Sequence, residues 1–140
     1  WVEELNAMNA MFVWRRNGRT VLSTPPLSGT ILEGVTRDSL LELARQQGGD
    51  IGIDEVLEEP TSIEAVRAGI ESGELREMFA CGTAAVIVPV GRLIDGDVAR
   101  TVGDGEPGAT TMALRSALLD IQYGRSTDTR GWMRTIEPVG

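Results

Sequence analysis

Residues 32–37 of this 140-residue chain form one of three segments whose residue types could support chemistry. Gly34 stands directly before Val35, Thr36 and Arg37, where a helix is expected to begin. The first N–H groups of a helix have no partner within it, and the helix dipole favours an anion there. A phosphate could therefore approach the main chain at Gly34, and the Thr36 hydroxyl could cap the helix or donate to that phosphate. The alternative is an ordinary helix start preceded by a glycine loop.

A second candidate is the run Cys81-Gly82-Thr83-Ala84-Ala85, in which small residues separate two apolar stretches. Such a break leaves amides unpaired and lets a ligand approach the main chain. The alternative is a β-bulge or a tight bend in the core. Cys81 itself is expected to be buried and inert, because its neighbours are apolar and the chain has no histidine to act as its base.

Two carboxylates, Glu3 and Glu4, stand directly before an expected strand. Because side chains alternate along a strand, one of the two should face inward, where a carboxylate needs a cation or a hydrogen-bond donor. The alternative is a pair of solvated charges on a fraying end.

The composition limits which reactions and partners are compatible with these residues. The chain has 21 acidic and 13 basic residues and a net charge of −8, which disfavours a nucleic-acid partner. Every basic residue is an arginine, so a lysine Schiff base, an imidazole base and a histidine metal ligand are excluded within these residues. The single cysteine allows no internal disulfide and favours a reducing compartment, so we expect a cytoplasmic protein. No apolar run reaches the roughly 18–20 residues that a membrane-spanning helix needs, so no membrane association is expected.

The hydrophobic periodicity predicts the elements that must position these candidates. Strands are expected at 8–14 and 20–23, joined by an Asn17-Gly18 turn and stopped by Pro25-Pro26. A helix from about Thr36 should end at Gly48-Gly49. The other expected elements are a weak edge strand at 51–59, a helix from a capping box at 61–64 to Gly73, a strand at 78–81 continued at 84–90, a hairpin at Asp95-Gly96 and a helix at 109–123. One α/β unit spanning 1–140 is the simplest organisation, and the start at Trp1 without Met leads us to expect a piece of a longer protein.

Together the three candidates resemble a known family. The run TPPLSGTILEGVTRD at 24–38 is similar to the signature segment of the branched-chain amino acid aminotransferases, which are pyridoxal-phosphate enzymes of fold type IV. The run MFACGTAAVIVPV at 78–90 is similar to their second signature. Residues 3–9 resemble the strand that carries the glutamate of the cofactor nitrogen, and 120–124 with Gly131-Trp132 resemble the C-terminal end. The resemblance covers essentially the whole chain, in the family's order and spacing.

The resemblance implies a fold and a role for each matching residue. The implied fold is the C-terminal part of the large cofactor-binding domain, a mixed sheet or pseudo-barrel with flanking helices. Glu4 would pair with the pyridinium nitrogen, main-chain groups at 32–36 and the Thr83 hydroxyl would hold the phosphate, and amides at 82–84 would meet the substrate carboxylate. The implied cofactor-binding residues are Glu4, Leu32, Gly34, Val35, Thr36 and Thr83, and the implied substrate-binding residues are Gly82, Thr83 and Ala84.

Several positions depart from the family pattern. Glu33 replaces a usual proline and Asn6 a usual glycine, while Ala85 and Val88 stand where some members carry a Cys-x-x-Cys, so no thiol switch is expected. The family's Schiff-base lysine, its phosphate-binding arginine and its aromatic pocket residues lie upstream of the matching region. We therefore expect the intact protein to be a homodimeric transaminase acting on Leu, Ile or Val and 2-oxoglutarate, with no catalytic lysine in these 140 residues.

Two other functions stay open at this point. One is a relative with the same fold, such as a D-amino acid aminotransferase or an aminodeoxychorismate lyase. The other is a non-catalytic α/β module. Gly82 before Thr83 and the ending from Tyr123-Gly124 to Trp132 favour the branched-chain enzyme, and a lysine encoded upstream of Trp1 would support the enzymatic functions.

Overall fold

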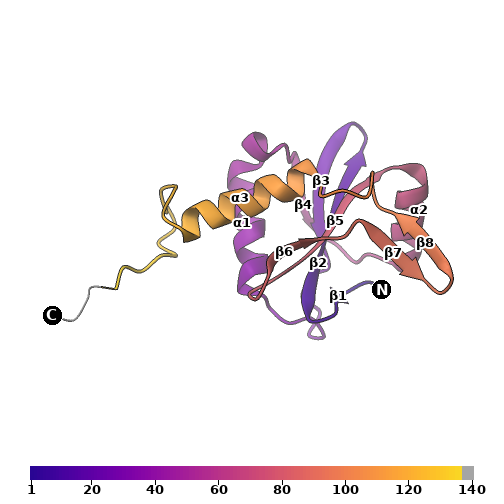
Figure 1. The fold of residues 1–140 in the computed structure, drawn as a ribbon, viewed down its shortest axis with the longest axis horizontal. Helices are drawn as coiled ribbons and strands as arrows, with labels where there is room; N and C mark the ends of the chain where they lie inside the picture. Colours follow the sequence, from indigo (N-terminus) through magenta and orange to yellow (C-terminus); the bar gives the residue numbers. More distant parts are fainter. Residues whose placement is uncertain (137–140) are drawn as a thin grey trace.

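The central feature of the structure, a computed structural model that describes residues 1–136, is a six-stranded mixed sheet (Figure 1). The strands follow the order β4-β3-β2-β5-β6, and the short β1 pairs with β2 beside this path. Their bounds are β1 Glu4–Leu5, β2 Met8–Arg16, β3 Arg19–Thr24, β4 Glu55–Glu58, β5 Leu75–Gly82 and β6 Val86–Pro89. The helices are α1 Val35–Ile51, α2 Ile63–Ser72 and α3 Ala109–Gln122, and a separate ribbon pairs β7 Arg92–Asp95 with β8 Val98–Thr101. The mixed α/β fold class is confirmed.

The central strand β2 is buried on both faces, which explains its apolar sequence. Residues 10–14 are at most 4% exposed, and alternate side chains enter different cores. Met11 and Val13 pack in one core with residues of α1 and α3, whereas Phe12 and Trp14 pack in the other with residues of α2. Figure 1 shows α1 and α3 on one side of the sheet and α2 with the β7–β8 ribbon on the other. The sheet thus lies between two helical layers.

The predicted Asn-Gly hairpin is confirmed. Strands β2 and β3 pair antiparallel up to Arg16 opposite Arg19, and the turn residues Asn17 and Gly18 have φ of 51° and 78°. Positive φ at both central positions is the requirement of this turn type. Strand β3 ends at Thr24, before the two prolines, and α1 then carries the chain across to β4, which lies parallel to β3 at the sheet edge.

The prediction that α1 ends at Gly48-Gly49 is wrong. The helix continues through a kink at Gln47 to Ile51, and Gly52, with φ of 83°, closes it by donating its N–H to the Gly48 carbonyl. Gly48 is needed for a close approach instead, because a Cβ there would lie 2.6 Å from the Ile53 carbonyl oxygen. Gly48 therefore permits a close contact with Ile53 beside the kink at Gln47, and Gly52 is the C-cap of the helix.

The prediction that the strand at 78–81 continues through 84–90 is also wrong. Strand β5 ends at Gly82, residues 83–85 form a turn, and β6 runs back antiparallel with Val86 opposite Gly82. Small residues permit this tight reversal, and the turn residues 83–85 are exposed at the surface and not packed in the core. Pro89 is tolerated because β6 is an edge strand that needs donors on one side only.

Smaller differences concern where elements begin. The α2 cap is Ser62, whose hydroxyl accepts from the Ala65 N–H at 3.0 Å, so the capping spacing at 61–64 is displaced by one residue. The edge strand β4 is shorter than the predicted 51–59, because α1 extends to Ile51. The Asp95-Gly96 hairpin, the Gly73 cap and the final helix are confirmed. Within residues 1–136, none of the helices has the length and apolarity to cross a bilayer.

Candidate active site

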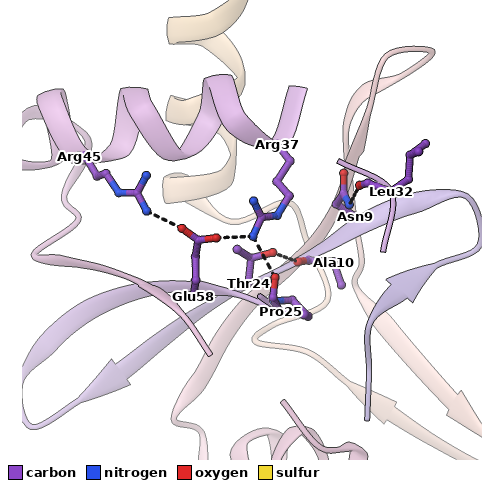
Figure 2. A network of polar contacts seen from close by, with 8 residues as sticks. All are labelled: Asn9, Ala10, Thr24, Pro25, Leu32, Arg37, Arg45 and Glu58. Carbon is purple, nitrogen blue, oxygen red and sulfur yellow. Dashed lines mark hydrogen bonds and ion pairs between the residues drawn. The ribbon is translucent and has the colours of Figure 1, made fainter. Parts of the chain in front are cut away.

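Asn9, near the start of β2, is the residue around which the predicted segments meet. Across the sheet it pairs with Glu4 on β1 and with Cys81 on β5. Its side chain is 5% exposed, and its Nδ2 donates to the Leu32 carbonyl at 3.0 Å (Figure 2). The glutamate strand, the 32–36 segment and the end of β5 therefore lie together at one end of the sheet. The sequence analysis did not select Asn9, although a polar residue near the start of an otherwise apolar strand was a signal.

Gly34 lies directly against the Asn9 side chain. A Cβ at Gly34 would collide with Asn9 Oδ1 and would lie 3.4 Å from the Arg37 Cβ. The backbone at Gly34 is extended, with φ of −89° and ψ of 123°. Glycine is therefore required here by the close approach and not by its conformational freedom.

The start of α1 presents open main-chain donors. Gly34 is the N-cap and no side chain caps the helix, so the predicted capping role of Thr36, the second helical residue, is wrong. The first hydrogen bond of the ladder runs from the Asp38 N–H to the Gly34 carbonyl at 2.9 Å. The N–H groups of Val35, Thr36 and Arg37 precede that ladder, where the helix dipole adds positive potential.

A shallow hollow of about 250 Å³ adjoins this helix start. Its lining includes the carboxylate residues Glu33 and Asp38, so its side chains add no positive charge except that of the buried Arg37. Leu32 and Val35 expose 76% and 80% of their surface beside it. An anion at this end of α1 would therefore be held chiefly by main-chain amides, next to exposed apolar surface.

Both N-terminal carboxylates bind the loop that precedes α1. Glu4 Oε1 accepts from the Leu32 N–H at 3.1 Å, and Glu3 Oε2 accepts from the Thr30 hydroxyl at 3.1 Å. Both residues are half-buried, so neither is a fully solvated charge. Strand β1 begins at Glu4, and Glu3 lies outside it, so the alternation of side chains along a strand does not separate the two carboxylates.

Asn6 lies in a turn whose backbone conformation explains why asparagine can stand where the family usually has glycine. It begins the two-residue turn between Leu5 and Met8 and has φ of 62°. Asparagine is among the few residues other than glycine that adopt this conformation readily. The replacement therefore preserves the turn that places Glu4 beside Asn9.

Arg37 anchors the start of α1 from inside the protein. It is 4% exposed, and its Nη2 donates to the Pro25 carbonyl at 2.9 Å and to Glu58 Oε2 at 2.7 Å. Arg45 donates to the other oxygen of Glu58 at 2.8 Å, as Figure 2 shows. Hydrogen bonds from Arg37 and then Arg45 hold the pKa of Glu58 below its ordinary value. The sequence analysis did not select the Arg37 side chain. A charged residue one helical turn before the buried Leu40 and Leu41 was a signal that it could be buried as well.

The turn that follows β5 supplies the second group of predicted residues. Thr83, Ala84 and Ala85 are exposed, and Gly82 lies beside Met8, since a Cβ there would be 3.4 Å from Met8 Cγ. Within the described residues no hydrogen bond joins the Thr83 hydroxyl to the start of α1.

Cys81 is fully buried, as predicted, and burial raises the pKa of its thiol to about 12. The thiolate is the form that reacts, so this thiol is inert at neutral pH.

Comparison with known proteins agrees with this arrangement. Residues 2–93 match the family described as amino-transferase class IV. The branched-chain-amino-acid aminotransferase of Mycolicibacterium smegmatis is 46% identical over 133 residues, which are 95% of this chain and 35% of that protein.

Solved structures of branched-chain amino acid aminotransferases also align with this chain. The branched-chain amino acid aminotransferase of Escherichia coli aligns with a TM-score of 0.68 and 35% identity over 89% of this chain and 36% of that chain. The enzyme of Thermobaculum terrenum in its PLP-form aligns with a TM-score of 0.66 and 33% identity over 88% and 34% of the two chains. The chain thus spans about a third of the length of these relatives. By its sequence and its fold, the chain belongs to the class IV aminotransferases.

Proposed function

We propose that the intact protein is a pyridoxal-phosphate-dependent transaminase that moves amino groups between Leu, Ile or Val and 2-oxoglutarate. The observation that carries this proposal is the meeting of the three motif segments around Asn9. The relatives that the chain matches over nearly its whole length are branched-chain aminotransferases, which supports the same substrate class.

The residues present at the start of α1 fit a phosphorylated cofactor. No side chain caps this helix, so the amides of Val35 and Thr36 at its start have no side-chain partner among the described residues. These two amides would hold the phosphate, joined by the hydroxyl of Thr83. When bound, pyridoxal phosphate supplies a ring that accepts the negative charge developing at the substrate α-carbon.

The roles that we assign to the chain's own side chains follow from their positions. The Glu4 carboxylate would accept a hydrogen bond from the protonated ring nitrogen and keep the proton on that atom. Amides of Gly82, Thr83 and Ala84, in an exposed turn at the same end of the sheet, would bind the substrate carboxylate. The expected contact between the Leu32 main chain and the phosphate is not part of this proposal, because its N–H donates to Glu4 and its carbonyl accepts from Asn9. The exposed apolar side chain of Leu32 would instead lie near the ring and exclude water there.

The remaining machinery would come from outside these residues. The chain contains no lysine, so we place the catalytic lysine upstream of Trp1. We further propose that the intact protein is a homodimer and that it is located in the cytoplasm. The lone, buried cysteine supports the cytoplasmic location.

The test is an assay of the intact protein with three substrate sets. We expect turnover of leucine with 2-oxoglutarate and little with D-alanine or aminodeoxychorismate. Preferential turnover of D-alanine or aminodeoxychorismate would replace our assignment with the corresponding relative. Absence of turnover and of cofactor binding would indicate a non-catalytic module.

A further inference from the structure

We propose that Asn9 is a positioning residue that sets the main-chain amides at the start of α1 for the cofactor phosphate. This inference rests on the proposed function. It assigns to a buried strand residue, which would touch neither cofactor nor substrate, a role in phosphate affinity.

The first support is the way Leu32 is held. Its N–H donates to Glu4 Oε1 at 3.1 Å, and its carbonyl accepts from Asn9 Nδ2 at 3.0 Å. Glu4 and Asn9 are direct partners across the β1–β2 pair. Two facing side chains of the sheet therefore fix both polar groups of one loop residue.

The second support is the contact at Gly34, only two residues further along. Asn9 Oδ1 occupies the space in which a Gly34 Cβ would lie. Asn9 thus contacts the loop at Leu32 and again at the N-cap of α1. A displacement of this side chain would shift the Val35 and Thr36 amides, which follow directly.

The third support is the rigidity of the platform that carries Asn9. The residue is 5% exposed on a strand that is paired on both sides at this point, with Glu4 and with Cys81. A binding group held by packing and by such supporting hydrogen bonds keeps its geometry to a fraction of an ångström. The loop itself has exposed residues at 32 and 33 and depends on this support.

The experiment compares variants of the intact protein by their affinity for pyridoxal 5′-phosphate and for pyridoxal, which lacks the phosphate. Asn9→Asp keeps the shape but places a carboxylate oxygen against the Leu32 carbonyl. We expect the dissociation constant of pyridoxal phosphate to rise about ten- to a hundredfold, with little change for pyridoxal. The matched control is Thr24→Val, which removes another buried hydrogen bond of the same sheet, from the Thr24 hydroxyl to the Ala10 carbonyl at 2.8 Å. The control should lower stability but leave the ratio of the two constants unchanged.

A double-mutant cycle with alanine at both positions tests the contact between Asn9 and Gly34. Gly34→Ala should weaken phosphate-dependent affinity strongly in the wild-type background and much less in the Asn9→Ala background, where the space is vacated. Strictly additive effects, or an unchanged ratio of constants in Asn9→Asp, would overturn the positioning role. If Asn9→Asp does not fold, the alanine cycle decides. If the wild type binds no pyridoxal phosphate, the proposed function and the phosphate role of Asn9 both fail. The cycle repeated on the free energy of unfolding would then still test the contact between Asn9 and Gly34.

Discussion

Glu4 and Asn9 face each other across the β1–β2 pair and together bind the amide and the carbonyl of Leu32. This arrangement joins the two N-terminal strands to the loop that leads into α1. The Glu4 carboxylate is thereby bound to the loop at the end of the sheet where the motif segments meet. Substitutions at Glu4 should therefore separate the effect of its charge from the effect of its position.

Glu4→Gln in the intact protein should lower kcat about ten- to a hundredfold, the equivalent of losing one charged hydrogen bond. The amide oxygen can still accept from the Leu32 N–H, so the loop should stay in place while the partner of a protonated ring nitrogen is lost. The loss should fall on kcat more than on KM, because the charge matters most in the transition state. Steady-state kinetics with leucine and 2-oxoglutarate measure both constants.

Glu3→Gln is the matched control, because Glu3 binds the same loop at Thr30. Its kcat should stay close to that of the wild type. If Glu3→Gln is the damaging change, the role assigned to Glu4 belongs to its neighbour. If neither variant loses activity, the role of this strand in the reaction is wrong.

The ion pairs of Glu58 should make stability depend on acid pH. Arg37 and Arg45 hold the pKa of Glu58 in the folded protein below its ordinary value of 4.5. The stabilisation is therefore fully present above pH 4.5 and is lost as the pH falls through the lower folded value. Denaturant unfolding between neutral pH and pH 3 should show a steeper loss for the wild type than for Glu58→Gln. Glu55→Gln, on the same strand, is the control, and equal slopes for Glu58→Gln and wild type would contradict the prediction.

Glu77 on β5 should contribute to stability by capping α3. Its carboxylate accepts from the Thr110 N–H at 3.1 Å and from the Thr111 N–H and hydroxyl at 2.7 Å each. Since Gly108 supplies no side-chain cap, Glu77→Ala should lower the free energy of unfolding by about 1–2 kcal/mol. Glu74→Ala, an exposed neighbour, should change it much less, and equal effects of the two variants would rule out the cap.

The 140-residue chain should form no covalent link to pyridoxal phosphate on an internal residue, because it contains no lysine. Reduction with borohydride followed by mass spectrometry and peptide mapping tests this. The intact protein, treated in parallel, should gain one cofactor mass on a lysine upstream of Trp1. A cofactor mass found between residues 2 and 140 would contradict the assignment.

The parts of this fold that local chemistry determines could be predicted from the sequence. The Asn17-Gly18 turn and the Gly73 cap depend on residues that tolerate positive φ, and both occur as expected. The glycines at 48 and 49 misled the prediction, because Gly48 serves a contact with Ile53 that no local rule reveals. The reversal at 83–85 was missed as a hairpin, since small residues suit a bulge and a turn equally.

The candidate site was predictable as segments but not as an arrangement. The open helix start after Gly34 follows from a glycine before a periodic apolar run. The contact between Asn9 and Leu32 joins residues 23 positions apart and depends on the register of the sheet, which the pattern of one strand does not specify. The same holds for Arg37, whose partner Glu58 lies beyond an entire helix.

The most direct test of the proposed cofactor site is a crystal structure of the intact protein with pyridoxal phosphate bound. We expect the phosphate oxygens to lie within hydrogen-bond distance of the Val35 and Thr36 amides. We also expect the Glu4 carboxylate to lie beside the ring nitrogen. A phosphate bound elsewhere, with the start of α1 facing only solvent, would rule out the proposed site.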